Sequence, residues 1–253
     1  MPPTTSKVPE ITLIFWIIKI AATTLGETGG DAVSMTLNLG YLVATAIFAV
    51  LFLGLVAAQI RARSFHPWLY WAVVVATTTV GTTMADFADR SLGMGYTGGA
   101  SILFALVLLS LGVWRRSEGT VSVNRIISPR VEAFYWVTIL FSNTLGTALG
   151  DWAADDGGLG FEGGALVFGS AILVIGGVYF ATSVSRTLLF WAAFILTRPL
   201  GATLGDLLTK PVPDGGLHLS RITSSLVIAV FIVACIAILP QRAGQHPGEA
   251  AAG

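Results

Sequence analysis

Residues 24–31 read TLGETGGD, and the same pattern returns three times along the chain. The related segments are TVGTTMAD at 79–86, TLGTALGD at 144–151 and PLGATLGD at 199–206. Each segment has a glycine five residues before its final aspartate and a second small residue directly before that aspartate. Four copies in common register indicate tandem repeats, which predict one structural unit used four times.

Further residues recur in the same register and define the length of each repeat. Steps of 55, 65 and 55 residues separate the copies, and the longer middle step contains a connector around residues 115–132. The chain is therefore predicted to have two halves of two repeats each, at about 9–63, 64–118, 129–183 and 184–240. The recurring residues are the aromatic-Trp pairs Phe15-Trp16, Tyr70-Trp71, Tyr135-Trp136 and Phe190-Trp191, and the glycines Gly40, Gly95, Gly160 and Gly215.

The composition is typical of an integral membrane protein. Of the 253 residues, 54% are hydrophobic and 11% are charged, and the mean hydropathy is +0.79. This balance leaves too little polar surface to cover a water-soluble globule of this size. The formal net charge is +0, which argues against nucleic acid as a partner. The one cysteine, Cys235, excludes a disulfide framework within the chain.

Eight apolar stretches are long enough to span a membrane as helices, and they lack the regular alternation of barrel strands. They predict a single all-α transmembrane domain over about residues 1–240, followed by a disordered cytoplasmic tail at 241–253. Because each repeat has an even number of spans, all copies share one orientation about the membrane normal. The stretches lie near 11–30, 37–60, 67–87, 98–114, 133–151, 163–183, 187–206 and 219–239.

Basic residues predict which side of the membrane each end of the spans faces. Nine of the 14 Lys and Arg residues fall in the tails and one set of loops, and three fall in the opposite loops. Under the positive-inside rule, both termini are cytoplasmic and the repeat aspartates lie toward the outer side. The nine are Lys7, Arg61, Arg63, Arg115, Arg116, Arg125, Arg130, Arg186 and Arg242, and the three are Arg90, Lys210 and Arg221.

Each repeat carries an aspartate near the outer end of its first span, where ionisable groups commonly line a cavity. Threonines on the same helix face would add hydroxyl groups to each aspartate. Four such stripes converging on one axis would supply hard oxygen ligands, which suit a divalent cation or protons, with the carboxylates as metal ligands. The alternative is that the aspartates are exposed loop acids. The candidate ion-binding residues are Asp31, Asp86, Asp151, Asp206, Glu27, Thr24, Thr28, Thr79, Thr83, Thr144 and Asn143.

Two basic residues within predicted spans, Lys19 and Arg198, break the symmetry of the repeats. They could form ion pairs that exchange partners as a substrate binds, as in a proton-coupled carrier. Alternatively, Lys19 extends toward the cytoplasm and Arg198 permanently neutralises one aspartate. Pro199 removes a helix hydrogen bond and predicts a break in the seventh span.

Other repeated residues are predicted to serve packing. The four repeat tryptophans lie near the cytoplasmic starts of their spans and predict an aromatic belt at the membrane interface. Small residues four apart, such as Gly26 and Gly30, let helices approach closely and could equally serve a homodimer. The sequence contains no phosphate-binding loop or hydrolase motif, and its three histidines form no cluster, so no enzymatic activity is expected.

The fourfold pattern of aromatic-Trp, Gly, Gly/Ala-Asp and Gly-aromatic resembles a bacterial multi-pass membrane family. That family is catalogued as a repeat of unknown function and as uncharacterised membrane-anchored proteins. The resemblance covers residues 9–240 and implies four tandem helix pairs in a bacterial cytoplasmic membrane. The fourth copy departs from the pattern by Pro199 in place of threonine and by Gly216 in place of the aromatic residue at Tyr41, Tyr96 and Phe161.

These observations favour a secondary transporter, with proton-coupled export of a divalent metal such as manganese as the leading hypothesis. No resident cofactor is expected, since a bound cation would be the substrate. Two alternatives stay open: a transporter of an organic solute, for which Lys19 and Arg198 would matter most, and a non-transporting membrane scaffold or sensor. The expected partners are membrane lipid and a small cation or solute.

Overall fold

The computed structural model describes residues 6–123, 126 and 128–244, and these residues form an all-α fold. Each predicted apolar stretch corresponds to one α-helix. The expected tail residues 245–253, and Arg125 in the connector, lie outside the described residues. The helices are α1 (Leu13–Asp31), α2 (Tyr41–Arg61), α3 (Pro67–Asp86), α4 (Gly95–Glu118), α5 (Pro129–Ala154), α6 (Gly160–Ala181), α7 (Arg186–Thr209) and α8 (Arg221–Ile238).

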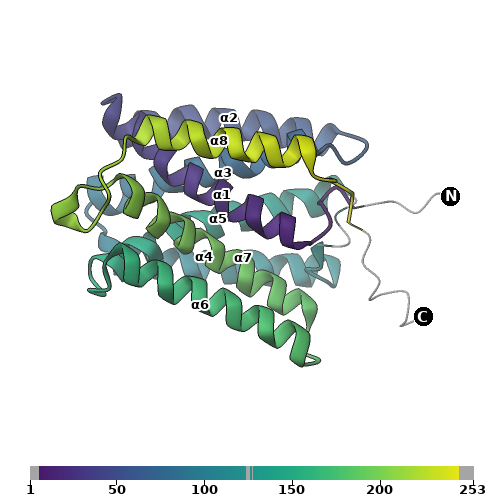
Figure 1. Ribbon diagram of the computed structural model, residues 1–253. Coiled ribbons are helices and arrows are strands. Elements are labelled where there is room, and N and C mark those ends of the chain that lie inside the picture. The colour runs from purple at the N-terminus through teal and green to yellow at the C-terminus, as the bar shows by residue number, and fades with distance from the viewer. Residues whose placement is uncertain (1–5, 124–125, 127, 245–253) are drawn as a thin grey trace.

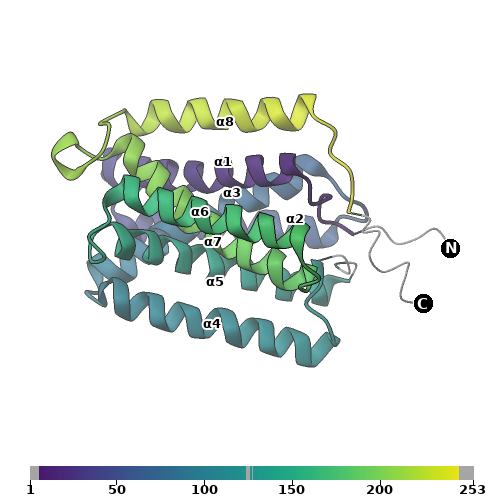
Figure 2. The ribbon, with the colours of Figure 1, turned by 60° about the horizontal axis from the view of Figure 1, so that its bottom comes forward.

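The odd-numbered helices form an inner ring, and the even-numbered helices surround it (Figures 1 and 2). Within the ring α1 contacts α3, α3 contacts α5, α5 contacts α7, and α7 returns to α1. Each outer helix packs mainly on the first helix of the following repeat: α2 on α3, α4 on α5, α6 on α7 and α8 on α1. The four helix pairs therefore close into a cycle, because α8 covers the helix that begins the chain.

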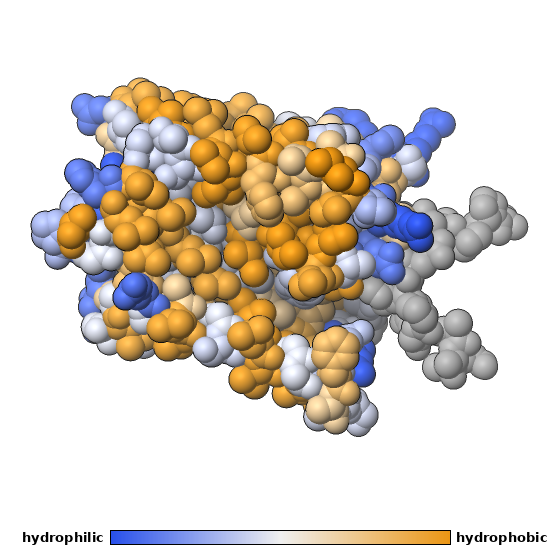
Figure 3. Space-filling view, viewed as in Figure 1, coloured by the Kyte–Doolittle hydropathy of each residue, from blue (hydrophilic) through white to orange (hydrophobic). Residues whose placement is uncertain are grey.

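The outer helices carry the apolar surface of the molecule. Among the described residues, five helices are long and apolar enough to cross a membrane: the outer helices α2, α4, α6 and α8 and the inner helix α7. Exposed side chains on the outer helices include Leu173 and Phe180, which are 77% and 87% exposed. Figure 3 shows hydrophobic residues across the middle of one face and hydrophilic residues toward its two ends. Contact with lipid accounts for this distribution, since a water-soluble protein rarely exposes so large an apolar patch.

Glycines hold the inner helices close together, as the spacing of small residues predicts. A Cβ atom on Gly26 would lie 2.6 Å from Thr78 Cβ, and one on Gly81 would lie 3.1 Å from the Asn143 backbone. Gly146 packs in the same way against Arg198, and Gly201 against Thr23. The contact thus recurs at all four interfaces of the ring, where only glycine permits this approach.

The second recurring glycine of each repeat has a different role. Gly40, Gly95, Gly160 and Gly215 all have positive φ angles, between 64° and 86°. An L-residue rarely adopts this backbone conformation, because its Cβ atom clashes with the neighbouring carbonyl. These glycines allow the tight turns through which the inner helix of each repeat is followed by its outer helix.

The predicted aromatic belt is wrong for three of its four tryptophans. Trp71, Trp136 and Trp191 are buried, and they form part of an aromatic cluster that also contains Tyr70 and Tyr135. The two tyrosine hydroxyls are 2.7 Å apart. The outer helices cover the inner ones, so these three tryptophans pack against other helices inside the bundle.

The predicted break at Pro199 is also wrong, because α7 continues through this residue without interruption. Proline leaves one carbonyl of the preceding turn without its helical donor but need not end a helix that neighbours support. The ring of Pro199 packs against Gly146, and its carbonyl oxygen lies close to Gly150. The two glycines of α5 provide the space that the proline occupies.

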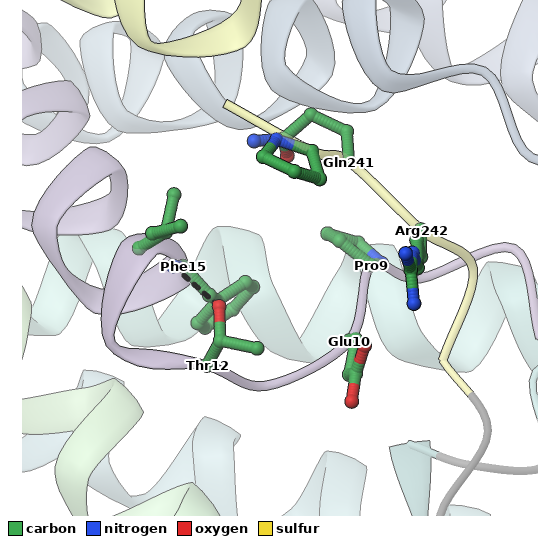
Figure 4. A pocket seen from close by; sticks show the side chains of 8 residues that line it. Pro9, Glu10, Thr12, Phe15, Gln241 and Arg242 are labelled. Carbon is green, nitrogen blue, oxygen red and sulfur yellow. Dashed lines mark hydrogen bonds between the residues drawn. The ribbon is translucent and has the colours of Figure 1, made fainter. Parts of the chain in front are cut away.

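The first and last described segments meet at one end of the bundle, here called the terminal end. Pro9 and Ala243 form an isolated antiparallel bridge, and Trp71 Nε1 donates to Gln241 Oε1 at 3.2 Å. Glu10, Thr12 and Phe15 line a pocket beside Gln241 and Arg242 (Figure 4). Residues 241–244, assigned to the tail from sequence, therefore pack against the start of the chain.

Candidate functional site

The four repeat aspartates lie together at the opposite end of the inner ring, here called the acidic end. Asp31 and Asp86 are the last residues of α1 and α3, and Asp151 and Asp206 lie in the last turn of α5 and α7. All four are buried, with at most 3% of their surface exposed. They are therefore not exposed loop acids. Their common level follows from the constant spacing of 15 residues between each tryptophan and its aspartate.

Three basic residues pair with these aspartates, and sequence reasoning assigned them only to loops. Arg90 Nε lies 2.9 Å from Asp86 Oδ1, and its Nη2 lies 3.8 Å from Asp151 Oδ2. Lys210 Nζ lies 3.2 Å from Asp31 Oδ2 and 3.2 Å from Asp206 Oδ1. Arg221 Nε lies 3.5 Å from Asp31 Oδ2. A signal was available, since Arg90 and Lys210 each stand four residues after an aspartate.

The electrostatics of these basic groups follow from their surroundings. Burial alone would lower the pKa of Lys210, but the carboxylates of Asp206 and Asp31 outweigh it and raise that pKa. Burial acts in the same direction on Arg90, and Asp86 and Asp151 raise the pKa of its guanidinium. Both side chains therefore stay protonated at neutral pH.

Glu27, Asp31 and Asp86 form a group of three buried carboxylates. One oxygen of each lies within 4.8 Å of one oxygen of the other two. Asp86 Oδ2 has no hydrogen-bond partner among the described residues, although Asp86 is only 3% exposed. A buried carboxylate oxygen without a donor is costly unless a proton or cation occupies the space beside it. The carboxylates thus offer oxygen ligands of the kind that hard cations prefer.

Arg198 lies in the middle of the ring, on α7 and about two helical turns before Asp206. Its Nη2 donates to Glu27 Oε2 at 2.9 Å, and also to the hydroxyls of Thr82 and Thr147. Glu27, Thr82 and Thr147 stand at the same position of the first three repeats, so each inner helix contributes one group to this contact. The side chain of Arg198 is fully buried, and its Nε and Nη1 have no partner in the described part of the chain.

Lys19 is also fully buried, so its side chain does not extend to the surface. Its Nζ donates to Asn143 Oδ1 at 3.3 Å and lies 4.2 Å from the centre of the Phe194 ring. Asn143 in turn donates to Thr77 Oγ1 at 2.8 Å. Lys19 therefore has an amide oxygen and an aromatic ring as partners, which accommodate its ammonium group less well than a carboxylate does.

The threonines of the predicted stripes make other hydrogen bonds than the expected ones with the aspartates. The hydroxyls of the five candidate threonines donate to backbone carbonyls of their own helices, so none of them donates to a carboxylate. The prediction missed Thr82 and Thr147, which reach the centre instead. A helix position one residue away points to another face, and the sequence alone does not fix which face turns inward. The five threonines are Thr24, Thr28, Thr79, Thr83 and Thr144.

A family profile described as "Repeat of Unknown Function (DUF347)" matches the chain four times, at residues 14–65, 69–120, 134–185 and 189–241. The chain belongs to the DUF347 family. Every DUF347 repeat starts two residues before its tryptophan and contains one inner helix followed by one outer helix. The resemblance inferred from the sequence is thereby confirmed. No curated protein and no solved structure shows significant similarity to the chain.

Proposed function

We propose that the protein is a secondary transporter that exchanges a small divalent cation, such as manganese, for protons. The observation that carries this proposal is the buried group of Glu27, Asp31 and Asp86, with oxygens within 4.8 Å of one another and a free oxygen on Asp86. Carboxylate oxygens accept magnesium, calcium and manganese, and manganese serves as the test ion. The cation is here a substrate.

In this proposal all eight helices cross a bacterial cytoplasmic membrane. The inner helices α1, α3 and α5 are shielded by the apolar outer helices, which explains how their polar residues are tolerated at membrane depth. At 19 residues, the shortest of these, α1, is about 30 Å long at 1.5 Å per residue, which matches a bilayer core. The excess of Lys and Arg at the terminal end favours cytoplasmic termini and an outward-facing acidic end.

Ion pairing supplies the coupling in this mechanism. Glu27 pairs with Arg198, Asp31 with Lys210 and Asp86 with Arg90, so each carboxylate of the group already has a basic partner. Buried charges are stable only when they are compensated. An incoming divalent cation must therefore displace a basic group or a proton, and the release of protons to the other side couples the two movements.

One observation favours a second candidate, the transport of an organic anion. Lys19 and Arg198 are both fully buried, and Arg198 Nε and Nη1 have no partner among the described residues. A carboxylate or phosphate on a substrate would satisfy these donors. Under this alternative, Arg198→Gln abolishes transport while Asp86→Asn leaves it intact. In either case we propose transport as the activity of the protein, with no covalent chemistry.

The flux of manganese into proteoliposomes tests the proposal. We expect saturable uptake by the wild type and loss of uptake in Asp31→Asn and Asp86→Asn, because each variant removes a charged ligand. Asp214→Asn is the matched control, since Asp214 is exposed in the segment after α7. Uptake that persists in both Asp31→Asn and Asp86→Asn, or is absent from well-folded wild type, would contradict a cation carrier.

A further inference from the structure

Arg90 and Lys210 are arranged as a pair around the acidic end. Arg90 bridges Asp86 and Asp151, and Lys210 bridges Asp31 and Asp206. Each basic side chain thus joins two inner helices, α3 with α5 and α7 with α1. The two bridges together engage all four aspartates of the ring and leave no inner helix without a connection.

The sequence explains why there are two bridges and not four. Both basic residues stand four positions after the aspartate of their own repeat, in the second and fourth copies. The first and third copies have Met35 and Asp155 at this position. The bridges therefore follow the division of the chain into two halves of two repeats each, since each half supplies one basic residue.

We propose that Arg90 and Lys210 form an outer gate. Their basic side chains pair with carboxylates to which the transported cation binds. This inference rests on the proposed function and adds the groups that control access to its site. A basic side chain repels a divalent cation that approaches the same carboxylate and neutralises part of the charge that would bind it, so opening of the bridges favours binding of the cation. When the site is empty, the bridges hold the inner helices together at the acidic end.

Exposure supports this role. The side chain of Arg90 is 33% exposed and that of Lys210 is 13% exposed, whereas the aspartates they bridge are at most 3% exposed. The basic groups thus lie between the buried carboxylates and the surface. Arg90 also lies 5.9 Å from the Tyr96 ring centre, and the Tyr96 hydroxyl donates to Asp155 Oδ2 at 3.2 Å. The guanidinium therefore has an aromatic ring and a carboxylate to which it can move when it leaves Asp86.

The affinity for manganese alone, measured by titration calorimetry on purified protein, tests the gate. We expect Arg90→Gln/Lys210→Gln to bind manganese about tenfold or more tightly than the wild type, because these two competing cations are gone and Arg221, which also lies beside Asp31, is the same in every variant. Arg90→Lys and Lys210→Arg keep the charge and should bind like the wild type. Arg115→Gln, an exposed residue in the last turn of α4, is the control. If the double variant aggregates, the two single variants carry the comparison.

The outcomes separate the gate from the proposed function. If wild type binds manganese, Asp86→Asn abolishes that binding and the glutamine variants bind no more tightly, the gate is wrong and the transporter stands. If none of the chains, including the glutamine variants, shows binding that Asp86→Asn removes, both proposals fail together. Both proposals are supported if the glutamine variants bind manganese more tightly than the wild type while the charge-keeping variants and Arg115→Gln do not.

Discussion

At the scale of single residues, the centre of the ring depends on the ion pair between Arg198 and Glu27. Both side chains are buried, and the Nη2 to Oε2 distance is 2.9 Å. A buried pair of this kind contributes little net stability compared with apolar residues, but loss of one partner leaves an uncompensated charge. The effects of substitutions at Arg198 and Glu27 on stability should therefore be coupled to each other more strongly than to substitutions elsewhere.

Glu27→Gln is expected to lower the free energy of unfolding by roughly 3–5 kcal/mol, because the Arg198 guanidinium loses its carboxylate. Glu27→Gln/Arg198→Met removes both charges and should recover most of the loss. Unfolding of the purified protein in mixed micelles, measured by circular dichroism, gives these values. A double variant as unstable as the single one would show that the pair is not coupled.

Asp89 predicts a dependence of stability on pH. It lies in the short π-helix Phe87–Ser91 that follows α3, beside Gly99, and both carboxylate oxygens lack a hydrogen-bond partner in the described structure. Burial raises the pKa of Asp89 to about 6, against the opposing effect of Arg90. The ordinary value is near 4. Ionisation is thus harder in the folded state, so stability is present at low pH and is lost as pH rises through about 6.

Melting temperatures between pH 4 and pH 7 test this sign. The wild type should lose stability across this interval by a larger amount than Asp89→Asn, which cannot ionise. Asp214→Asn, in an exposed turn, should follow the wild type. Equal pH profiles for wild type and Asp89→Asn would remove Asp89 as the source.

At the scale of helices, much of the packing was predictable and some was not. The small residues four apart predicted the close faces of the inner helices, whereas the positive φ angles and the turns at the second set of recurring glycines were not predicted. The burial of the tryptophans was not predictable, because each outer helix packs on the next repeat and pairing between repeats leaves no local pattern. The contact of Arg90 with Asp151 also joins two repeats and leaves no local pattern, whereas its contact with Asp86 is indicated by the spacing of four residues.

Gly81→Ala should destabilise the interface of α3 and α5. The added Cβ would lie 3.1 Å from the Asn143 backbone, which cannot move aside as a flexible side chain can. Overpacking of this kind costs roughly 1–3 kcal/mol. Gly176→Ala in α6 is the matched control, since nothing lies within 4 Å of its Cβ position. Thermal unfolding of both variants should separate them, and equal stability would contradict the tight contact.

At the scale of the whole molecule, the ring closes because α8 covers α1. The hydroxyl of Ser225 donates to Thr28 Oγ1 at 2.9 Å, although the residues are separated by 197 positions in the chain. This closure gives α1 the same covered environment as the other inner helices. The repeats predicted the number of helices, but linear order alone did not show that the last helix returns to the first.

Cysteine cross-linking tests the closure. In a Cys235→Ala background, Thr28→Cys with Ser225→Cys should cross-link under copper-catalysed oxidation or with a short bifunctional maleimide. Thr28→Cys with Ser170→Cys should not, because Ser170 lies on α6, which packs on α7. Cleavage of the loop between α4 and α5 before electrophoresis shows whether the two halves are joined. Halves that separate in the first variant would contradict a closed ring.

The most direct test of the central claim is manganese-driven proton movement in proteoliposomes that contain a pH-sensitive dye. For the wild type, manganese added outside should enter while protons leave, so the luminal pH rises. Asp86→Asn should abolish the rise, and Asp214→Asn should preserve it. Manganese entry without a change in luminal pH, or no entry into vesicles with well-folded wild type, would contradict an exchanger built on the buried carboxylates.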